Sequence, residues 1–364
     1  MNRKVTGSPT LLLDVEKCKR NINLMASKAK RHGLIFRPHF KTHQSLEIGQ
    51  WFKAEGVSKI TVSSLVMAEY FASEWDDITV AFPVNILEID RINSLANRIT
   101  LNLLVENTES VTFLAKHLHF RVNLFLKIDV GYHRTGIDPG NLDLIEEILQ
   151  LIESSPFLRF SGFLAHAGHT YRFRNAIGIE MIHRLSLAMM RQLKEYFSSR
   201  FPGLIISLGD TPSCSLAENF TDLDEIRPGN FVFYDLTQHA MGSNSVSTIA
   251  VAMECPIVSI HKDRGELIIY GGGVHFSKDR LDFENGFHFG RVVEKKPQGW
   301  GDPISGMYVT ALSQEHGKVA VPSELIGQFK IGDTLLILPV HSCMTANAMK
   351  GYLTLEGKWI KRCY

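Results

Sequence analysis

The stretch Leu34-Ile-Phe-Arg-Pro-His-Phe-Lys-Thr-His43 joins a short apolar run to a basic segment and is the most informative part of the chain. Its first three residues are typical of a short buried strand, and a helical pattern follows it. Lys41 is therefore expected at the mouth of a strand, where the positive charges of Arg37 and the two histidines disfavour its ammonium form. Such a lysine is more readily neutral and nucleophilic, as Schiff-base chemistry requires. The alternative is a solvated basic loop, and the rest of the chain decides between the two.

Short apolar runs alternate with helix-like patterns from about residue 34 to residue 235. The runs are residues 34–36, 59–62, 78–82, 101–105, 122–128, 160–164, 204–208 and 231–233. The segment 178–199 shows the apolar spacing of a helix and stops at Phe201-Pro202-Gly203. Eight strands that alternate with helices predict parallel β-α-β units, and eight is the number that closes a barrel. We therefore predict an α/β fold with a (β/α)8 barrel of the TIM type. We prefer it to a doubly wound open sheet because the reactive residues follow strands, and such loops open on one face of a barrel.

Beyond about residue 245 the pattern changes to strand-like runs that glycine turns and polar loops separate. These runs are residues 249–253, 255–260, 266–270, 307–309, 318–321 and 334–338. No long helical pattern lies among them, which predicts a separate antiparallel β domain. We place the barrel at residues 15–245 and the β domain at residues 1–14 and 246–364, with Leu11-Leu12-Leu13 adding a strand. The triplet Gly271-Gly272-Gly273 is interpreted as a β-turn.

The composition excludes several classes of protein. Lysine and arginine total 39 against 38 acidic residues, so the chain has no field suited to nucleic acid or a membrane surface. Five cysteines without zinc-finger or CxxC spacing argue against a full disulfide framework. The apolar run at residues 11–13 is too short for a signal peptide or a membrane span. We expect a cytoplasmic protein.

Two loops carry side chains suited to acid–base work or to a flat ligand. Asp129-Val-Gly-Tyr-His-Arg-Thr-Gly136 follows the fifth run, and its Arg134 could bond a phenolic oxygen or a carboxylate, or bridge loops structurally. His166-Ala-Gly-His169-Thr-Tyr171 follows the sixth run. Its histidines and tyrosine could supply acid–base groups, an aromatic wall or metal ligands, and one histidine could be purely structural.

Two further loops favour a phosphate group. Leu208-Gly-Asp-Thr-Pro-Ser-Cys214 follows the seventh run and offers backbone amides at an expected helix start. Glu225-Ile-Arg-Pro-Gly-Asn230 adds Arg227 and the amides of Gly229 and Asn230. Either loop alone would more often be an ordinary turn. Together they occupy the place after the last barrel strands where phosphate sites occur in such barrels.

The segment Pro339-Val-His341-Ser-Cys343-Met-Thr345 follows a strong run of the second domain. Histidine and cysteine two positions apart on an extended segment point to the same side, so they could share one metal ion. The pair suits zinc, and only two protein ligands would leave room for water or substrate. A buried histidine beside a free thiol is the alternative.

Together these motifs resemble the D-threonine aldolase and D-serine dehydratase family, which shares the alanine-racemase-type barrel of fold-type III pyridoxal-phosphate enzymes. The likeness covers nearly the whole chain, through Arg-Pro-His-Phe-Lys-Thr-His, Asp-Val-Gly-Tyr-His-Arg-Thr-Gly, His-Ala-Gly-His, Arg-Pro-Gly-Asn-Phe-Val-Phe-Tyr-Asp, Gln-Glu-His-Gly and His-Ser-Cys. The resemblance implies a homodimeric lyase that acts on small D-β-hydroxy-α-amino acids. It also implies pyridoxal 5'-phosphate and a divalent metal as cofactors, with zinc preferred to manganese or magnesium.

The resemblance implies a role for each candidate residue. Lys41 would hold the cofactor as an imine, Arg134 would face its phenolic oxygen, and Tyr171 would lie beside its ring. The other cofactor-binding candidates are His166, Gly209, Thr211, Arg227, Gly229 and Asn230. His341 and Cys343 would bind the metal next to the substrate.

The reaction depends on which group removes a proton. If Lys41 takes the α-proton, hydroxide leaves and a keto acid and ammonia form; if His43 or His169 takes the hydroxyl proton, the Cα–Cβ bond breaks. The His-x-Cys pattern resembles the dehydratases, whereas aldolases often place an aspartate at the position of Cys343, so we favour dehydration. A racemase that uses Tyr308 as a second base and a non-catalytic pyridoxal-phosphate carrier are the alternatives.

Overall fold

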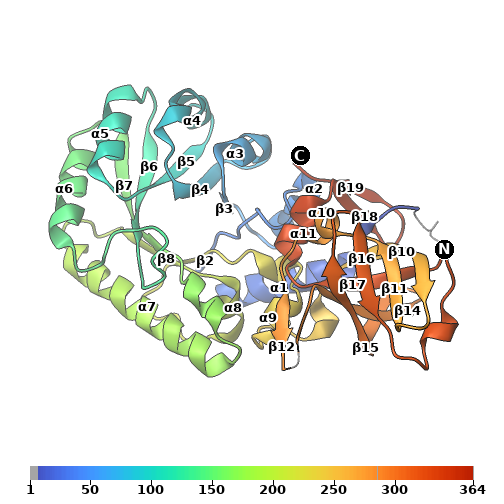
Figure 1. Ribbon diagram of the computed structural model, residues 1–364. Coiled ribbons are helices and arrows are strands. Elements are labelled where there is room, and N and C mark those ends of the chain that lie inside the picture. The colour runs from blue at the N-terminus through green and yellow to red at the C-terminus, as the bar shows by residue number, and fades with distance from the viewer. Residues whose placement is uncertain (1–6, 285, 364) are drawn as a thin grey trace. The chain divides into compact units, whose positions relative to one another are not determined.

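The computed structural model describes residues 7–284 and 286–363 and divides into two compact units (Figure 1). The barrel unit is Asn23–Gly229 with Cys363, and the sheet unit combines the N-terminal segment up to Ile22 with Asn230–Arg362. The helix α1 (Val15–Arg31) passes from one unit to the other. The boundaries between the two compact units fall at residues 22/23 and 229/230. The domain limits expected at residues 15 and 245 stay a prediction.

Eight parallel strands form the barrel unit. They are β2 (Ile35–Phe36), β3 (Ile60–Val62), β4 (Asp77–Pro83), β5 (Thr100–Val105), β6 (Val122–Ile128), β7 (Leu158–Ala165), β8 (Ile205–Leu208) and β9 (Glu225–Ile226), in the spatial order β2-β9-β8-β7-β6-β5-β4-β3. A parallel bridge between His39 and Thr61 joins the two ends of this row. There the amide of Phe40 donates to Thr61 O at 2.8 Å, and the amide of Thr61 donates to Pro38 O at 2.9 Å. The predicted α/β barrel is confirmed.

The eighth barrel strand is not the one predicted. Residues 231–233 are buried, but residues 230–232 form a short 3-10 helix, and the eighth strand is β9, which precedes Pro228 and Gly229. The sequence conceals β9 because its first residue is Glu225, a charged side chain that is nevertheless 0% exposed. Apolar character alone therefore selects the wrong segment.

Helices cover the outside of the barrel strands, as Figure 1 shows for α3 to α7. The helices are α2 (Leu46–Ala54), α3 (Leu65–Phe71), α4 (Ile89–Ala96), α5 (Thr108–His117), α6 (Leu142–Glu153), α7 (Ala176–Phe197) and α8 (Thr211–Leu216). The side chains of Asn107, Asn141 and Asn175 begin α5, α6 and α7 by accepting a backbone N–H from the third residue beyond each. The helix expected over 178–199 is confirmed as α7. No helix among the described residues combines the length and the apolar character needed to cross a membrane.

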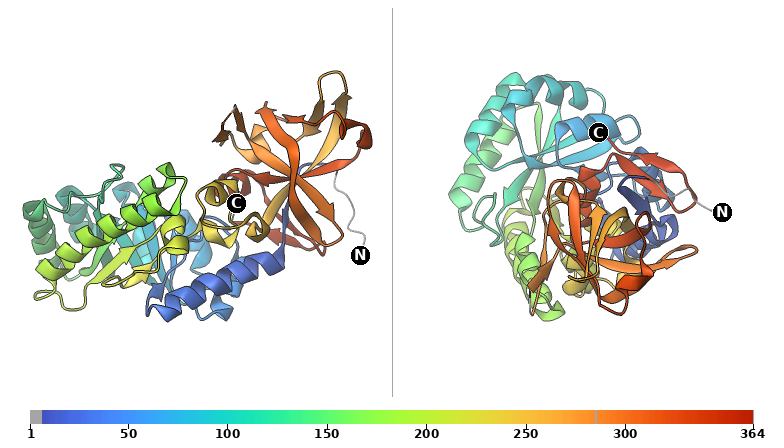
Figure 2. Two further views of the ribbon diagram at one scale, coloured as in Figure 1. Left: turned by 90° about the horizontal axis from the view of Figure 1, so that it is seen from below. Right: turned by 45° about the vertical axis from the view of Figure 1, so that its right-hand side comes forward.

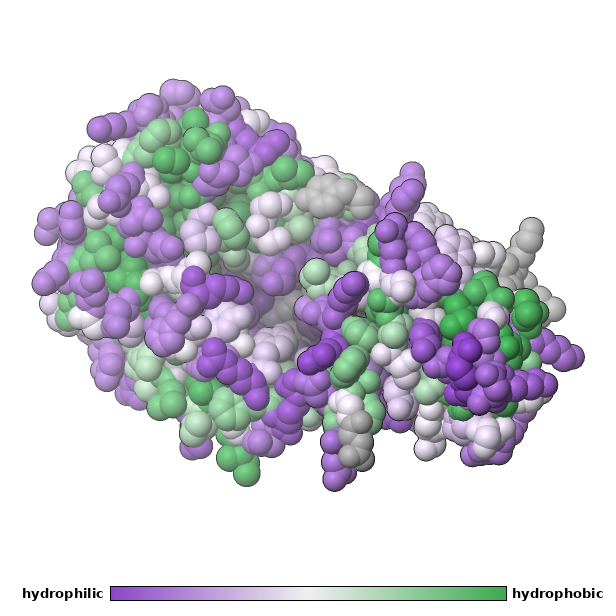
Figure 3. Space-filling view, in the orientation of Figure 1, coloured by the Kyte–Doolittle hydropathy of each residue, from purple (hydrophilic) through white to green (hydrophobic). Residues whose placement is uncertain are grey.

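On the face of the barrel unit seen in Figure 3, hydrophobic residues lie in small groups between hydrophilic ones. Such scattered groups are ordinary for a protein surface. The apolar side chains of the core are instead enclosed, as Leu104, Phe125 and Leu164 show at 1–2% exposure between β5, β6 and β7.

A nine-stranded, mostly antiparallel sheet forms the core of the sheet unit, and Figure 2 shows its strong twist. Its strands, in spatial order, are β11 (Glu266–Tyr270), β16 (His316–Ala320), β15 (Gly299–Leu312), β14 (Gly290–Lys296), β17 (Thr334–Pro339), β10 (Val251–His261), β1 (Thr10–Leu13), β18 (Gly351–Thr354) and β19 (Trp359–Lys361). A hairpin of β12 (Leu281–Phe283) and β13 (Gly286–His288) and the short helices α9 (Leu236–Ala240), α10 (Gly273–Phe276) and α11 (Ser342–Ala348) complete the unit. The N-terminal strand β1 pairs with β10 and β18, as expected.

The glycine triplet at residues 271–273 differs from its interpretation as a simple turn. It leads into the helix α10, whose first residue is Gly273 and whose N-cap is Gly272. A four-residue helix is too short to show a periodic apolar pattern, so no sequence signal predicts it.

A network of ion pairs and hydrogen bonds surrounds the buried Arg37 in the barrel unit. The Arg37 guanidinium is 2% exposed, and it donates to Glu225 Oε2 and to Asp77 Oδ1, each at 2.6 Å. Ser207 Oγ donates to the other oxygen of Glu225, and Asn102 Nδ2 donates to Asp77. Two carboxylates therefore neutralise the charge of Arg37, and the expected effect of that charge on Lys41 stays a prediction.

Glu225→Ala should lower the free energy of unfolding by about 3 kcal/mol or more, because it leaves the buried Arg37 charge without one of its carboxylates. The measurement is urea unfolding of the cofactor-free protein. The control is Glu195→Ala, whose carboxylate pairs with Arg191 on the surface of α7 at 2.9 Å and should cost at most about 1 kcal/mol. Equally small losses in both variants would show that the buried network does not support the barrel.

Candidate functional site

Lys41 lies directly after the bridge that closes the barrel. Residues 40–43 form a turn, Lys41 is exposed, and its backbone amide donates to His39 Nδ1 at 3.4 Å. Because the bridge continues β2 and pairs with the strand β3 near its middle, the chain leaves the barrel at the C-terminal ends of the strands. That end carries the active site in barrels of this kind. The structure thus places Lys41 at the mouth, as expected from the sequence.

Two histidines, His39 and His166, experience the positive charge of Lys41, and both are neutral near pH 7. Desolvation lowers the pKa of His39 well below its usual value, and the charges of Lys41 and Arg227 lower it further. Desolvation likewise lowers the pKa of His166, and the charges of Lys41 and Arg134 add to it. The sequence predicted His166 as a site residue, and the structure brings it together with Lys41 electrostatically. Both rings can act as hydrogen-bond acceptors near neutral pH.

Lys127 is a further candidate residue, which the sequence analysis did not select. It lies on β6 with 5% exposure, and its Nζ donates to Ile128 O at 2.8 Å and to Thr135 O at 3.4 Å. Desolvation first, then the charge of Arg227, lowers its pKa to about 8. The alternation of side chains along a strand could have identified it, because Lys127 lies two residues after the core residue Phe125 and therefore on the same face of β6.

The loop that carries Arg134 is wound around Asp129. Oδ1 of Asp129 accepts the amides of Gly131, Tyr132 and His133, each at 3.0 Å, and Oδ2 lies 2.9 Å from His133 Nδ1. Although burial opposes it, the backbone hydrogen bonds from His133 and Gly131 lower the pKa of Asp129. The guanidinium of Arg134 lies 5.1 Å from the centre of the Tyr132 ring. Arg134 is therefore fixed by a preformed loop and a cation–π contact.

Tyr132 joins this loop to the histidine loop after β7. Its ring lies parallel to that of His169 at 6.2 Å and edge-on to that of His166 at 5.9 Å. A Cβ at Gly168 would come within 2.4 Å of the Tyr132 ring, so only glycine permits this approach. Nδ1 of His169 is buried and finds no hydrogen-bond partner among the described residues, and desolvation lowers the pKa of His169. Tyr171 follows on the same 3-10 turn, Gly168–Arg172.

His43, the other proposed base, is not brought to the mouth. Its ring is 0% exposed and packs against Phe40 at 4.4 Å and against Phe52 at 5.5 Å. Its Nδ1 accepts the amide of Ser45 at 3.1 Å. His43 thus supports the turn from the core side, and its catalytic role stays a prediction without structural support.

The loops expected to hold a phosphate converge closely. Gly209 has φ +154, and a Cβ there would lie 2.9 Å from the amide nitrogen of Arg227. A Cβ at Gly229 would lie 2.9 Å from His39 O and 3.2 Å from Thr42 Oγ1. Both positions therefore require glycine, because a side chain would collide with the neighbouring loop. Thr211 begins α8, which Asp210 caps by accepting from Ser213 N at 2.9 Å.

Arg227 and Asn230, two further candidates for phosphate binding, differ in the partners of their side chains. Arg227 is 5% exposed, donates to the carbonyls of Ala165 and Ser207, and has its pKa lowered to about 10, chiefly by desolvation. Its Nε has no partner among the described residues. The Asn230 side chain is engaged elsewhere, because its Nδ2 donates to Asp235 Oδ2 at 2.6 Å.

His341 and Cys343 come together at the start of α11. His341 is the N-cap, and Cys343 already lies within the helix, so the extended geometry assumed for the pair is wrong. The helix start nevertheless lets the two side chains hydrogen-bond. Burial opposes the charged form of His341, but hydrogen bonds to Asp279 and Cys343 outweigh it and raise its pKa to about 11. Asn230 Nδ2 approaches Cys343 Sγ at 3.4 Å.

An imidazole nitrogen and a thiol sulfur are the donors that zinc prefers, so the pair fits a zinc ion. No cluster of three or more His, Cys, Asp or Glu side chains within residues 7–284 and 286–363 could hold a metal. A metal at this pair would therefore keep coordination positions for water or substrate.

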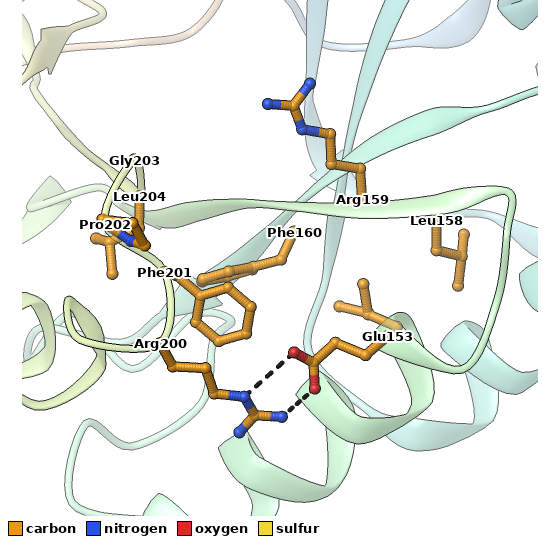
Figure 4. Close-up of a pocket in the computed structure, with 10 residues that line it drawn as sticks. Glu153, Leu158, Arg159, Phe160, Arg200, Phe201, Pro202, Gly203 and Leu204 are labelled. Carbon is orange, nitrogen blue, oxygen red and sulfur yellow. Dashed lines mark hydrogen bonds and ion pairs between the residues drawn. The ribbon is translucent and has the colours of Figure 1, made fainter.

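A hollow lies at the opposite end of the barrel strands from Lys41. Residues Ile152, Glu153, Leu158–Phe160 and Arg200–Leu204 line it, at the start of β7 and just before β8 (Figure 4). Its Arg200 bonds Glu146 at 2.6 Å and also bonds Glu153, so two carboxylates already neutralise this cation. The hollow lacks an activated group and is not the candidate site.

Two families of protein domains match the chain. The family described as "Alanine racemase, N-terminal domain" matches residues 13–236, and the family described as "Putative serine dehydratase domain" matches residues 250–355. The chain is 30% identical to the D-serine dehydratase of Dictyostelium discoideum, over 96% of this chain and 94% of that protein. It is 26% identical to the D-threo-3-hydroxyaspartate dehydratase of Delftia sp. (strain HT23), over 96% of this chain and 94% of that protein.

The solved structures agree with these similarities. A mutant D-threo-3-hydroxyaspartate dehydratase in its metal-free form is 25% identical and superposes with a TM-score of 0.91 over 98% of both chains. These relatives are lyases, so the predicted enzyme class and the resemblance drawn from the motifs are confirmed.

The burial of Lys127 should make stability depend on pH in a defined direction. Its pKa is about 8 in the folded chain against 10.5 when unfolded, so the unfolded chain binds more protons between these values and stability rises with pH. Relative to Lys127→Met, the free energy of unfolding of the cofactor-free protein should gain up to about 3 kcal/mol from pH 8 to pH 10.5. Lys116→Met, on the exposed side of α5, should behave like the unsubstituted protein. Parallel pH curves for Lys127→Met and the unsubstituted protein would contradict this burial.

Proposed function

From the premise that the chain belongs to the alanine racemase N-terminal domain family, joined to a serine dehydratase domain, we propose that it is a pyridoxal-phosphate- and metal-dependent dehydratase of D-3-hydroxy amino acids. Its relatives named dehydratases support the reaction and the class of substrate. The observation that carries the proposal is the place of Lys41, one turn beyond the bridge that closes the barrel mouth.

The residues at the mouth fit pyridoxal phosphate. When bound, the cofactor supplies an aldehyde for an amine and a ring that delocalises charge from the α-carbon of the substrate. Lys41 would hold it and would afterwards move the α-proton with its Nζ. Arg134 would donate to the phenolic oxygen, and the neutral ring of His166 would accept a hydrogen bond without adding charge.

The convergent loops would bind the phosphate group. Glycine at positions 209 and 229 lets these loops pack closely together, and the start of α8 at Thr211 would add backbone amides. The Asn230 side chain is engaged with Asp235, so only its backbone could take part. Arg227 and Lys127 would add positive charge to the same end of the barrel.

His341 and Cys343 would hold the divalent metal. Their nitrogen and sulfur donors favour zinc over magnesium or manganese, which prefer oxygen ligands. When bound, zinc supplies a Lewis acid for a hydroxyl group.

The residues favour dehydration over aldol cleavage. Cleavage needs a base for the hydroxyl proton, and His43 is enclosed by Phe40 and Phe52. His169 is the remaining candidate of the two. For a racemase, Tyr308 on β15 packs edge-on against Phe283 at 5.5 Å and pairs with Arg291 across the sheet, which gives it no sign of activation. The proposal includes the homodimer that the resemblance implies and the cytoplasmic location expected from the composition.

Lys41→Ala should abolish the visible absorbance of the pyridoxal-phosphate complex, because the amine that holds the aldehyde is removed. The measurement is the absorption spectrum of the purified protein after incubation with the cofactor. Lys116→Ala, on the exposed side of α5, should keep the spectrum of the unsubstituted protein. An unchanged spectrum of Lys41→Ala would refute the assignment.

Incubation with D-serine and with D-threonine should yield pyruvate and 2-oxobutyrate with ammonia. EDTA and Cys343→Ala should each lower turnover at least about 100-fold, as expected for loss of a Lewis acid, while the cofactor absorbance stays. Met344→Ala, next to the pair and 46% exposed, should keep full turnover. Glycine and an aldehyde as products would mean aldol cleavage, and full activity in EDTA would overturn the metal requirement.

A further inference from the structure

We infer that Asp279 is a positioning residue that orients His341 toward a metal ion through a hydrogen bond to the far side of its ring. Asp279 Oδ2 lies 3.1 Å from His341 Nδ1. The inference deepens the proposed function, because it rests on His341 and Cys343 as the metal pair.

The hydrogen bond decides which ring nitrogen is available. A carboxylate can only accept, so Nδ1 of His341 must carry the hydrogen and donate it to Asp279. Nε2 then keeps its lone pair for a metal in the neutral ring. Metal-binding histidines commonly have such a carboxylate behind them, which fixes the tautomer and raises the basicity of the ligand.

Asp279 acts behind the ring and is not a third ligand. Among the described residues no set of three ligating side chains could meet on one ion, although Asp279, His341 and Cys343 are all described. The oxygen that faces His341 also accepts a hydrogen bond from Ser277 Oγ at 2.9 Å. Both bonds converge on Oδ2, so this oxygen is committed within the protein.

The glycine triplet explains how the sequence delivers this carboxylate. A Cβ at Gly271 would lie 2.5 Å from Cys255 Sγ, and a Cβ at Gly272 would lie 2.2 Å from Gln314 O. Only glycine therefore allows the chain to pass this closely over β10 and the turn before β16. The chain then forms α10, and Ser277, with φ +69, turns it toward Asp279.

The helices that carry the two partners are fastened together. Thr345 Oγ1, on α11, donates to Phe276 O, at the end of α10, at 2.8 Å. Thr345 is 0% exposed, so this bond is protected from water. Asp279 follows α10 by three residues and His341 precedes α11 by one, so the bond holds their distance.

The test measures zinc affinity of the metal-free protein with its pyridoxal phosphate in place, by competition with a chromophoric chelator. Asp279→Ala should weaken zinc binding by about 10- to 100-fold. Asp279→Asn keeps an oxygen that can accept from Nδ1 and should lose less than Asp279→Ala. Asp282→Ala removes a neighbouring carboxylate that pairs with Arg280 at the surface, at 3.4 Å, and should bind zinc like the unsubstituted protein.

Cobalt(II) gives a readout that general loosening of the fold would not imitate. In Asp279→Ala the charge-transfer band of the Cys343 thiolate should remain, while the ligand-field bands should change because the imidazole is no longer oriented. Unchanged cofactor absorbance and far-ultraviolet circular dichroism would show that the variant is folded.

Different results would refute the metal pair and the role of Asp279. If His341→Ala and Cys343→Ala lose zinc but Asp279→Ala binds it as tightly as the unsubstituted protein, the role of Asp279 is refuted and the metal pair stands. If His341→Ala also binds zinc unchanged, both the metal pair and the role of Asp279 are refuted.

Discussion

The backbone hydrogen bond from Phe40 to Thr61 helps to close the barrel, and the position of Lys41 at its mouth follows from that closure. It ends the regular pairing at His39 and releases the chain into the turn that carries Lys41. The turn is supported on two sides. Gly229 lies against it without a side chain, and Phe40 packs within a cluster of aromatic rings that includes Phe52 at 5.0 Å. Lys41 is thereby presented by a turn whose neighbours pack against the core.

The mouth concentrates positive charge while its histidines stay neutral. Arg227 and Lys127 are buried there with lowered pKa values of about 10 and about 8, both chiefly because of desolvation. Such buried cations cost stability unless an anion compensates them. A ligand that carries a phosphate and a phenolic oxygen would supply that compensation, which links the electrostatics to the proposed cofactor.

The parts of the structure that the sequence predicted are those where chemistry and periodicity coincide. Lys41 was found because a basic group follows an apolar run, and the loop of Arg134 because glycines and charges follow another. The strand β9 was missed because its buried residue Glu225 is polar, its partner being Arg37. Lys127 was missed because its apolar neighbours masked it.

Contacts between distant segments are not predicted from the sequence. Asp279 meets His341 across 62 positions of sequence, and nothing local to either residue announces the contact. His43 lies in a basic stretch of sequence, but its ring packs against Phe40 and Phe52, and its catalytic role stays a prediction. A residue type and its neighbours predict what a side chain can do, whereas its direction depends on packing between distant segments.

The central claim is that Lys41 is the residue that holds the cofactor. The most direct measurement is borohydride reduction of the protein with pyridoxal phosphate, followed by proteolysis and mass spectrometry of the modified peptide. The account predicts a single pyridoxyl group on Lys41. A pyridoxyl group on Lys127 or on another lysine, with Lys41 unmodified, would contradict it.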